Sequence, residues 1–118
     1  MSLCYVEFGK PMDDYCEASS YSFGMGSSNI LAGTNRKASM HDLTFTKEND
    51  SMSRKIWQAC MAGTPFATVW VEFYRDEDSD AYAVFTLGNV IVSSISTRGS
   101  KDTVGLNFAT MKSDYISR

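Results

Sequence analysis

The feature that most constrains this chain is a set of alternating runs rich in β-branched and aromatic residues. Residues 67–73 alternate in this way, and residues 104–109 place Val104, Leu106 and Phe108 on one face. This alternation is typical of half-buried strands. We therefore expect a mainly β fold, either a small β-barrel or a sandwich of two packed antiparallel sheets.

Runs of the same kind recur along the chain, at residues 4–8, 17–23, 39–46, 81–87 and 90–96. The acidic segment 76–80 separates two strand-like runs and predicts a hairpin turn. Gly88 and Asn89 predict a break or bulge. Residues 24–38 are rich in glycine, serine and asparagine, which indicates a long loop.

One segment has helical rather than alternating spacing. Residues 49–51 offer N-cap side chains, and Gly63 followed by Pro65 ends the segment. Apolar residues recur between these limits at Met52, Ile56, Trp57 and Cys60. We expect one helix that flanks the barrel, packed through Met52, Ile56 and Cys60 with Trp57 beside them.

Length and charge exclude several classes of protein. The chain has 118 residues, which suits one domain over residues 1–118. A net charge of −3 without a basic cluster gives no indication of nucleic-acid binding. No apolar stretch approaches the roughly 20 residues of a membrane span, and the first residues lack the pattern of a signal peptide. We expect synthesis in the cytoplasm and no membrane insertion.

The residues that carry enzyme chemistry are few and badly spaced. The three cysteines, Cys4, Cys16 and Cys60, contain no CxxC pair, which argues against disulfides and structural zinc. The single histidine, His41, precedes Asp42 on an alternating strand, so the two side chains point to opposite faces. We predict no catalytic, cofactor-binding or metal site. A small hydrolase with His41 as its base is the enzyme hypothesis that stays open.

Five strings in sequence order resemble one protein family. They are SFGMGSS at 22–28, HDLTFTK at 41–47, QACMAG at 58–63, NVIVSSIST at 89–97 and LNFA at 106–109. Over about residues 20–116 the chain resembles the hemolysin-coregulated protein (Hcp) family, the tube proteins of the bacterial type VI secretion system. Relative to typical members it looks shortened in the N-terminal hairpin loop and at the C-terminus.

This resemblance implies a phage tail-tube-like barrel that forms hexameric rings, which stack into a tube and carry effectors. It also implies partners in the sheath, spike and effector proteins, and secretion without a cleaved signal peptide. No cofactor is implied. The alternative is a free-standing adaptor or chaperone that binds one effector without building tubes.

Two surfaces are candidates for this assembly. The candidate ring interface lies in the predicted loop and comprises Gly24, Gly26, Ser27, Ser28, Ile30 and Leu31. A lumen that passes folded cargo needs small polar side chains, and the candidate lumen face comprises Ser94, Ser96, Asn107, Ala109 and Ser113. In a monomer the same polar face would simply meet solvent, and the two apolar loop residues would cover their own core.

Overall fold

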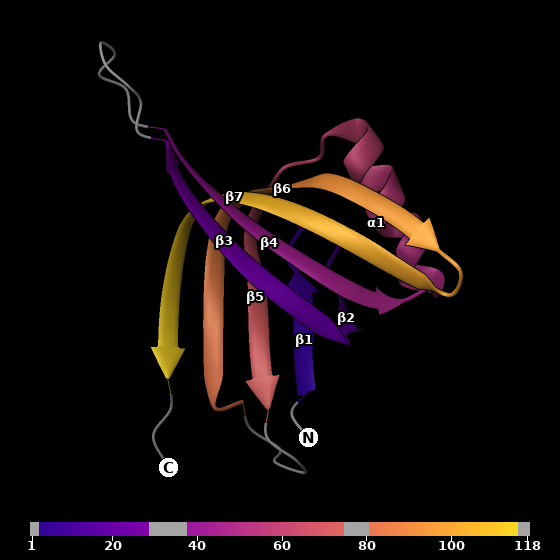
Figure 1. The fold of residues 1–118 in the computed structure, drawn as a ribbon, viewed down its shortest axis with the longest axis horizontal. Coiled ribbons are helices and arrows are strands. Elements are labelled where there is room, and N and C mark those ends of the chain that lie inside the picture. Colours follow the sequence, from indigo (N-terminus) through magenta and orange to yellow (C-terminus); the bar gives the residue numbers. More distant parts are fainter. Residues whose placement is uncertain (1–2, 29–37, 75–80, 116–118) are drawn as a thin grey trace.

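The computed structural model describes residues 3–28, 38–74 and 81–115. Within these ranges the chain forms seven strands and one helix (Figure 1). In order they are β1 (Leu3–Phe8), β2 (Asp14–Ala18), β3 (Ser20–Ser28), β4 (Ala38–Glu48), α1 (Ser51–Ala62), β5 (Phe66–Tyr74), β6 (Ala83–Arg98) and β7 (Lys101–Tyr115).

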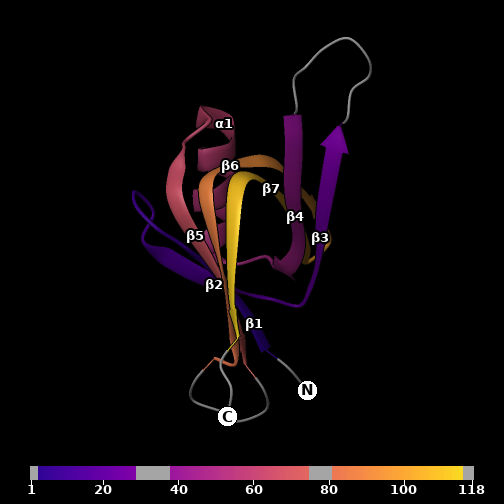
Figure 2. The same cartoon turned by 90° about the vertical axis from the view of Figure 1, so that its left-hand side faces the viewer.

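The described strands belong to one antiparallel sheet in the order β2-β1-β5-β6-β7-β4-β3. Both β6 and β7 curve strongly, so the sheet curls into a half-barrel whose two ends form facing layers (Figures 1 and 2). The predicted mainly β fold with one flanking helix is confirmed. Its two packed layers are continuous, because β6 and β7 run through both.

The curl brings the two edges of the sheet together at one point. Strands β2 and β3 lie at opposite edges, yet only Ser19 separates them in the chain. The Ser19 backbone N–H donates to the Thr46 carbonyl oxygen at 2.7 Å, and its hydroxyl donates to the same oxygen at 3.1 Å. These bonds hold the turning point of the chain against β4.

The bend in β6 occurs where the sequence predicts a break. Asn89 has a left-handed backbone with φ of 55°, which asparagine tolerates better than most residues. The buried residues change parity there, from Ala83 and Leu87 to Val90 and Val92. The strand nevertheless continues, because cross-strand pairing holds on both sides. A separate register shift falls between Val92 and Ser94.

The core fills the space between the two layers. Phe23 of β3 stacks on Phe85 of β6 at 5.2 Å between ring centroids, and Tyr21 contacts Phe73 of β5 at 5.0 Å. The largest fully buried apolar side chains are Phe8, Phe45, Phe66, Leu43, Ile56, Leu87 and Leu106. Both layers and the helix contribute to this set, so neither layer has a separate core.

Helix α1 begins and ends where its caps predict. Asp50 is the N-cap: its Oδ1 accepts from the Met52 backbone N–H at 3.0 Å, and Ser53 Oγ accepts from the Asp50 N–H at 3.0 Å. Gly63 ends the helix in the left-handed conformation. Met52 and Ile56 are buried as expected.

The helical register differs slightly from the prediction. Ala59 is buried at the end of the packed face, whereas Cys60 is half-buried and Trp57 is 39% exposed. Among the described residues no helix has the length and apolar character to cross a membrane.

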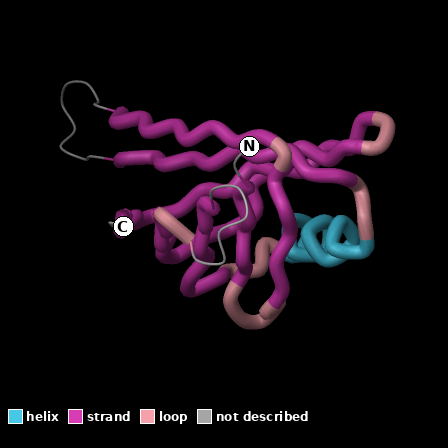
Figure 3. The backbone as a smooth tube through the Cα atoms, turned by 90° about the horizontal axis from the view of Figure 1, so that it is seen from below, coloured by secondary structure: helices cyan, strands magenta, loops and turns pink. Residues whose placement is uncertain are grey.

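The predicted loop over residues 24–38 is wrong at both ends. Residues Gly24 to Ser28 continue β3, and β4 begins at Ala38, with which Ser28 pairs (Figure 3). Cross-strand pairing outweighs the weak local preference of glycine and serine for strands. Only residues 29–37 separate the two strands, and they lie outside the described residues, as does the whole predicted acidic turn over residues 76–80.

Candidate functional site

A face of small polar side chains covers one side of β3, β4, β7 and the second half of β6. We call this set the polar face: Ser20, Ser22, Asp42, Thr44, Thr46, Ser94, Ser96, Thr103, Asn107 and Ala109. Thr46 and Asn107 are half-buried and the others are exposed. Apart from Asp42, these side chains are uncharged, so the face offers hydrogen-bonding groups with little net charge. Ile91, which lies opposite Asn107 and is 41% exposed, adds an apolar side chain to the same side.

Strand register places these side chains together. Asp42 lies opposite Asn107, Thr46 lies opposite Thr103, and Thr103 lies opposite Ser96. The intervening residues of the same strands, such as Leu43 and Val104, are fully buried on the reverse side. Because successive side chains of a strand point to opposite sides of the sheet, burial of one set in the core places the other set on the polar face.

Gly105 allows the strands to approach closely at the centre of the polar face. A Cβ added there would lie 2.6 Å from Ser94 Oγ and 3.3 Å from Ser93 Oγ. Ser93 is the extra residue at the register shift of β6. The two serine hydroxyls therefore occupy the space that a larger residue at position 105 would fill.

The structure brings together most of the predicted lumen face. Four of its five residues belong to the polar face: Ser94, Ser96, Asn107 and Ala109. Sequence alternation alone had assigned these four to the candidate lumen face. Ser113 is exposed but lies beyond the bend, opposite Phe85. It is therefore separate from the other four.

The candidate ring-interface residues have a different position from the one expected. Gly24 is exposed on edge strand β3, opposite Asp42, and Gly26, Ser27 and Ser28 extend the same edge. The remaining candidates, Ile30 and Leu31, lie outside the described residues. The described part of the candidate interface is thus a strand edge and not a loop.

Sequence reasoning missed the contribution of β3 and β4 to the polar face. The missed residues are Ser20, Ser22, Asp42, Thr44, Thr46 and Thr103. Alternation with Leu43 and Phe45 did indicate the side occupied by Asp42, Thr44 and Thr46. The sequence did not indicate the pairing of β4 with β7, which joins two polar strips 57 to 65 residues apart in the chain.

A buried ionic network supports one end of the polar face. Lys47 and Asp102 lie opposite each other on β4 and β7 and both are fully buried, with Lys47 Nζ 3.4 Å from Asp102 Oδ2. Lys47 also donates to Asp50 Oδ1 at 2.7 Å and to Ser53 Oγ at 3.0 Å. Asp102 accepts from Ser53, from Asn49 at 3.0 Å and from Thr97 at 2.7 Å.

This network ties the start of α1 to the β6–β7 hairpin. Burial by itself raises the pKa of Asp102, but the hydrogen bonds from Ser53, Asn49 and Thr97 and the charge of Lys47 outweigh it. The pKa of Asp102 therefore lies below its ordinary value, and this carboxylate is charged at neutral pH.

The candidate reactive groups lie apart from one another. His41 stacks on Phe108 at 5.4 Å between ring centroids, and Asp42 projects to the opposite, polar face. Burial raises the pKa of Cys4 and of Cys16 to about 12, so both thiols stay protonated at neutral pH. In the described part of the chain, no group of three or more His, Cys, Asp or Glu side chains is placed to hold a metal ion.

Comparison with known proteins assigns the family. The model of the family described as "Type VI secretion system effector, Hcp" matches residues 9–115. This chain belongs to the Hcp family. The resemblance found in the sequence strings is thereby confirmed.

Individual Hcp proteins support the same assignment. Protein hcp1 of Pseudomonas aeruginosa is 36% identical over 87 residues, which are 67% of this chain and 54% of that protein. The chain thus spans about half the length of this curated relative.

Solved structures extend the likeness to the whole fold. Hcp1 of Salmonella typhimurium has a TM-score of 0.77 at 17% identity. The match covers 97% of this chain and 86% of the Salmonella chain. The tube-terminating cap of the anti-feeding prophage has a TM-score of 0.65 at 10% identity. The match covers 95% of this chain and 87% of the cap chain. At these identities the likeness concerns the fold, which this Hcp chain shares with a protein of a tube assembly.

Proposed function

We propose that this Hcp-family chain is a structural subunit of a type VI secretion tube. Six copies form a ring, and rings stack into a hollow tube whose lumen is lined by the polar face. The observation that carries this proposal is the continuous polar face across four strands, backed by the core. A wall of mostly small, nearly uncharged side chains, with Ile91 as an exposed apolar residue among them, offers a folded effector few apolar groups on which to be trapped.

The two ends of the four-stranded layer support head-to-tail assembly. Strand β3 is an edge strand, and β5 pairs with β6 only as far as Val90, so residues 91–98 of β6 pair only with β7 among the described strands. Open strand edges are ready templates for pairing with another chain. Because these two edges are unlike, their contact is heterologous, the kind of contact that builds a ring when the rotation from one copy to the next closes.

The tube role also requires no enzymatic site. A tube wall needs complementary edges and a uniform face, whereas a hydrolase needs a nucleophile and a base within hydrogen-bonding reach. His41 is held against Phe108 and away from Asp42. As a tube subunit, the protein would be made in the bacterial cytoplasm, meet the sheath, spike and effectors, and leave without a cleaved signal peptide.

Mass in solution tests the proposal. Light scattering should give a particle of six times the 13.1 kDa chain mass, and electron microscopy at high protein concentration should show rings or stacked tubes. A stable monomer that binds one effector at a ratio of one to one would contradict the tube role. It would instead indicate the free-standing adaptor.

A further inference from the structure

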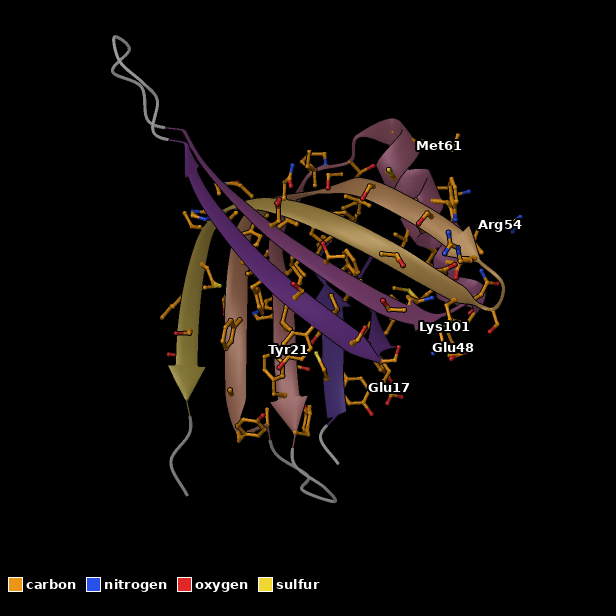
Figure 4. All side chains as sticks on the ribbon, viewed as in Figure 1. Glu17, Tyr21, Glu48, Arg54, Met61 and Lys101 are labelled. Carbon is orange, nitrogen blue, oxygen red and sulfur yellow. The ribbon has the colours of Figure 1, made fainter. Side chains whose placement is uncertain are left out.

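The outer face of β2, β1 and β5 has a composition unlike that of the polar face. On β1, Tyr5 and Glu7 alternate with the buried residues Cys4, Val6 and Phe8. Tyr5 lies opposite Glu17 on β2 and opposite Glu72 on β5, and Glu7 lies opposite Tyr15. We call this set the tyrosine–glutamate face: Tyr5, Glu7, Tyr15, Glu17, Glu72 and Tyr74. Figure 4 shows Glu17 on β2.

The tyrosine rings form the walls of a hollow. Tyr5 meets Tyr15 edge to face at 5.9 Å between ring centroids, and meets Tyr74 in the same way at 5.6 Å. Together with Glu7 and Glu72 these rings line an open hollow of about 400 Å³. Tyr15 remains 60% exposed, so much of its ring is available to a partner.

The negative charges of the two carboxylates in this hollow have no positively charged partner among the described residues. Neither Glu7 nor Glu72 forms an ion pair with a described residue, whereas Lys47, Lys55 and Lys101 are each paired with other acids. Partial burial raises the pKa of Glu72, and the nearby charge of Glu7 raises it further. A cation placed between them would offset the repulsion and favour the charged form of Glu72.

We propose that the tyrosine–glutamate face binds an arginine side chain presented by a partner protein. A guanidinium is planar, so it can stack on a tyrosine ring while its N–H groups donate to a carboxylate. A lysine ammonium carries the charge but lacks the planar set of N–H donors. A neutral or acidic side chain carries no positive charge to pair with the two carboxylates. The proposal does not rest on tube assembly, because the polar face lies on other strands.

Peptide titration of the full chain tests this proposal. We expect acetyl-Gly-Arg-Gly-amide to shift the backbone amide NMR signals of Tyr5, Glu7 and Glu72. The citrulline peptide of the same shape, which has no charge, should cause little shift. The double variant Glu7→Gln/Glu72→Gln should weaken arginine-peptide binding about fivefold or more, because it removes both charge-assisted acceptors. Tyr15→Ala should weaken it by a smaller factor.

The matched control is Glu48→Gln, which removes an exposed glutamate that lies outside this face and pairs with Lys101. Its affinity for the peptide should equal that of the parent. Equal binding of the citrulline peptide, or unchanged affinity in the double variant, would overturn the proposal. So would loss of self-association in the double variant without peptide binding by the parent, which would make this face a contact between copies of the chain.

Discussion

The ammonium of Lys47 is buried in the protein interior, where it forms an ion pair with the carboxylate of Asp102. A buried charge is tolerated only when it is paired and hydrogen-bonded. Here the donors Ser53, Asn49 and Thr97 satisfy Asp102, and the acceptors of the β4–α1 connection satisfy Lys47. The pair therefore fixes the register of β4 against β7 and the start of α1 in one arrangement.

Removing one partner of this pair should be strongly destabilising. Lys47→Met leaves Asp102 buried without its counter-charge, so we expect a loss of about 3–5 kcal/mol of unfolding free energy in urea. The double variant Lys47→Met/Asp102→Leu should lose less than the sum of the two single changes. Lys101→Met, which breaks the exposed pair with Glu48, should change stability by less than about 1 kcal/mol. A similar loss in both lysine variants would contradict the role of burial.

Acid should destabilise the protein partly through Asp102. The folded-state pKa of this carboxyl lies below its ordinary value of about 3.9, so its contribution is complete above that pH and is lost as pH falls through the lowered pKa. Urea unfolding from pH 7 to pH 3 should therefore show a weaker acid dependence in Asp102→Asn. Asp14→Asn is the control: its pKa is also lowered, by Lys55, but this exposed pair should matter little. Identical pH dependence in the parent and Asp102→Asn would refute the assignment.

Sequence alone predicted which side of β4 is buried but not the burial of Lys47. The alternation of Leu43 and Phe45 extends to position 47, yet an isolated lysine at the end of a strand normally indicates solvent. Only the pairing of β4 with β7 supplies Asp102, which lies 55 residues further along the chain. Long-range pairing of this kind leaves no signal in local composition.

At the scale of elements, helix α1 was the most predictable part of the chain. Its capping residues and the stop at Gly63 act within a few positions, so the sequence contains all the information that they need. The β3–β4 pair was less predictable. Glycine and serine at residues 24–28 have weak strand preference, and their conformation depends on the partner strand β4.

The packed face of α1 gives a test at this scale. Ile56→Asp places an unpaired carboxylate at a fully buried position, so we expect loss of the cooperative thermal transition or a large fall in its midpoint. Met61→Asp is the matched control on the same helix, because Met61 is 79% exposed. Its midpoint should stay within a few degrees of the parent. A parent-like melt for Ile56→Asp would show that the buried face is assigned wrongly.

For the whole molecule, the mainly β class followed from alternation, whereas the curvature of the sheet did not. The bend depends on the left-handed backbone of Asn89 and the change of buried parity from Leu87 to Val90. The sequence indicated an interruption at this place, but not that both strands would continue around it. This bend is also why Ser113 leaves the polar face that Asn107 and Ala109 share.

The proposed lumen gives a prediction for the assembled state. Asn107→Cys, in a background with Cys60→Ser, should react with a small maleimide in rings but be shielded from a bulky one in stacked tubes. Cys4 and Cys16 are buried, so they should stay unlabelled in the folded protein. Ser113→Cys is the control, because it lies beyond the bend and should react with both reagents. Equal labelling of Asn107→Cys by both reagents in tubes would place the polar face outside the lumen.

The one-residue link at Ser19 sets an order of events during synthesis. Strand β1 can pair with β2 as soon as both have left the ribosome, but its other neighbour, β5, emerges more than 45 residues after β2. The β3–β4 pair is local and can form early, whereas the β1–β5 pair must wait for β5, and non-local pairing of this kind slows folding. Until β5 arrives, the nascent chain is two hairpins joined end to end through Ser19. The half-barrel can close only after β6 and β7 have followed, because these two strands join β5 to β4 in the sheet. By then the Ser19 link already holds the first hairpin against β4.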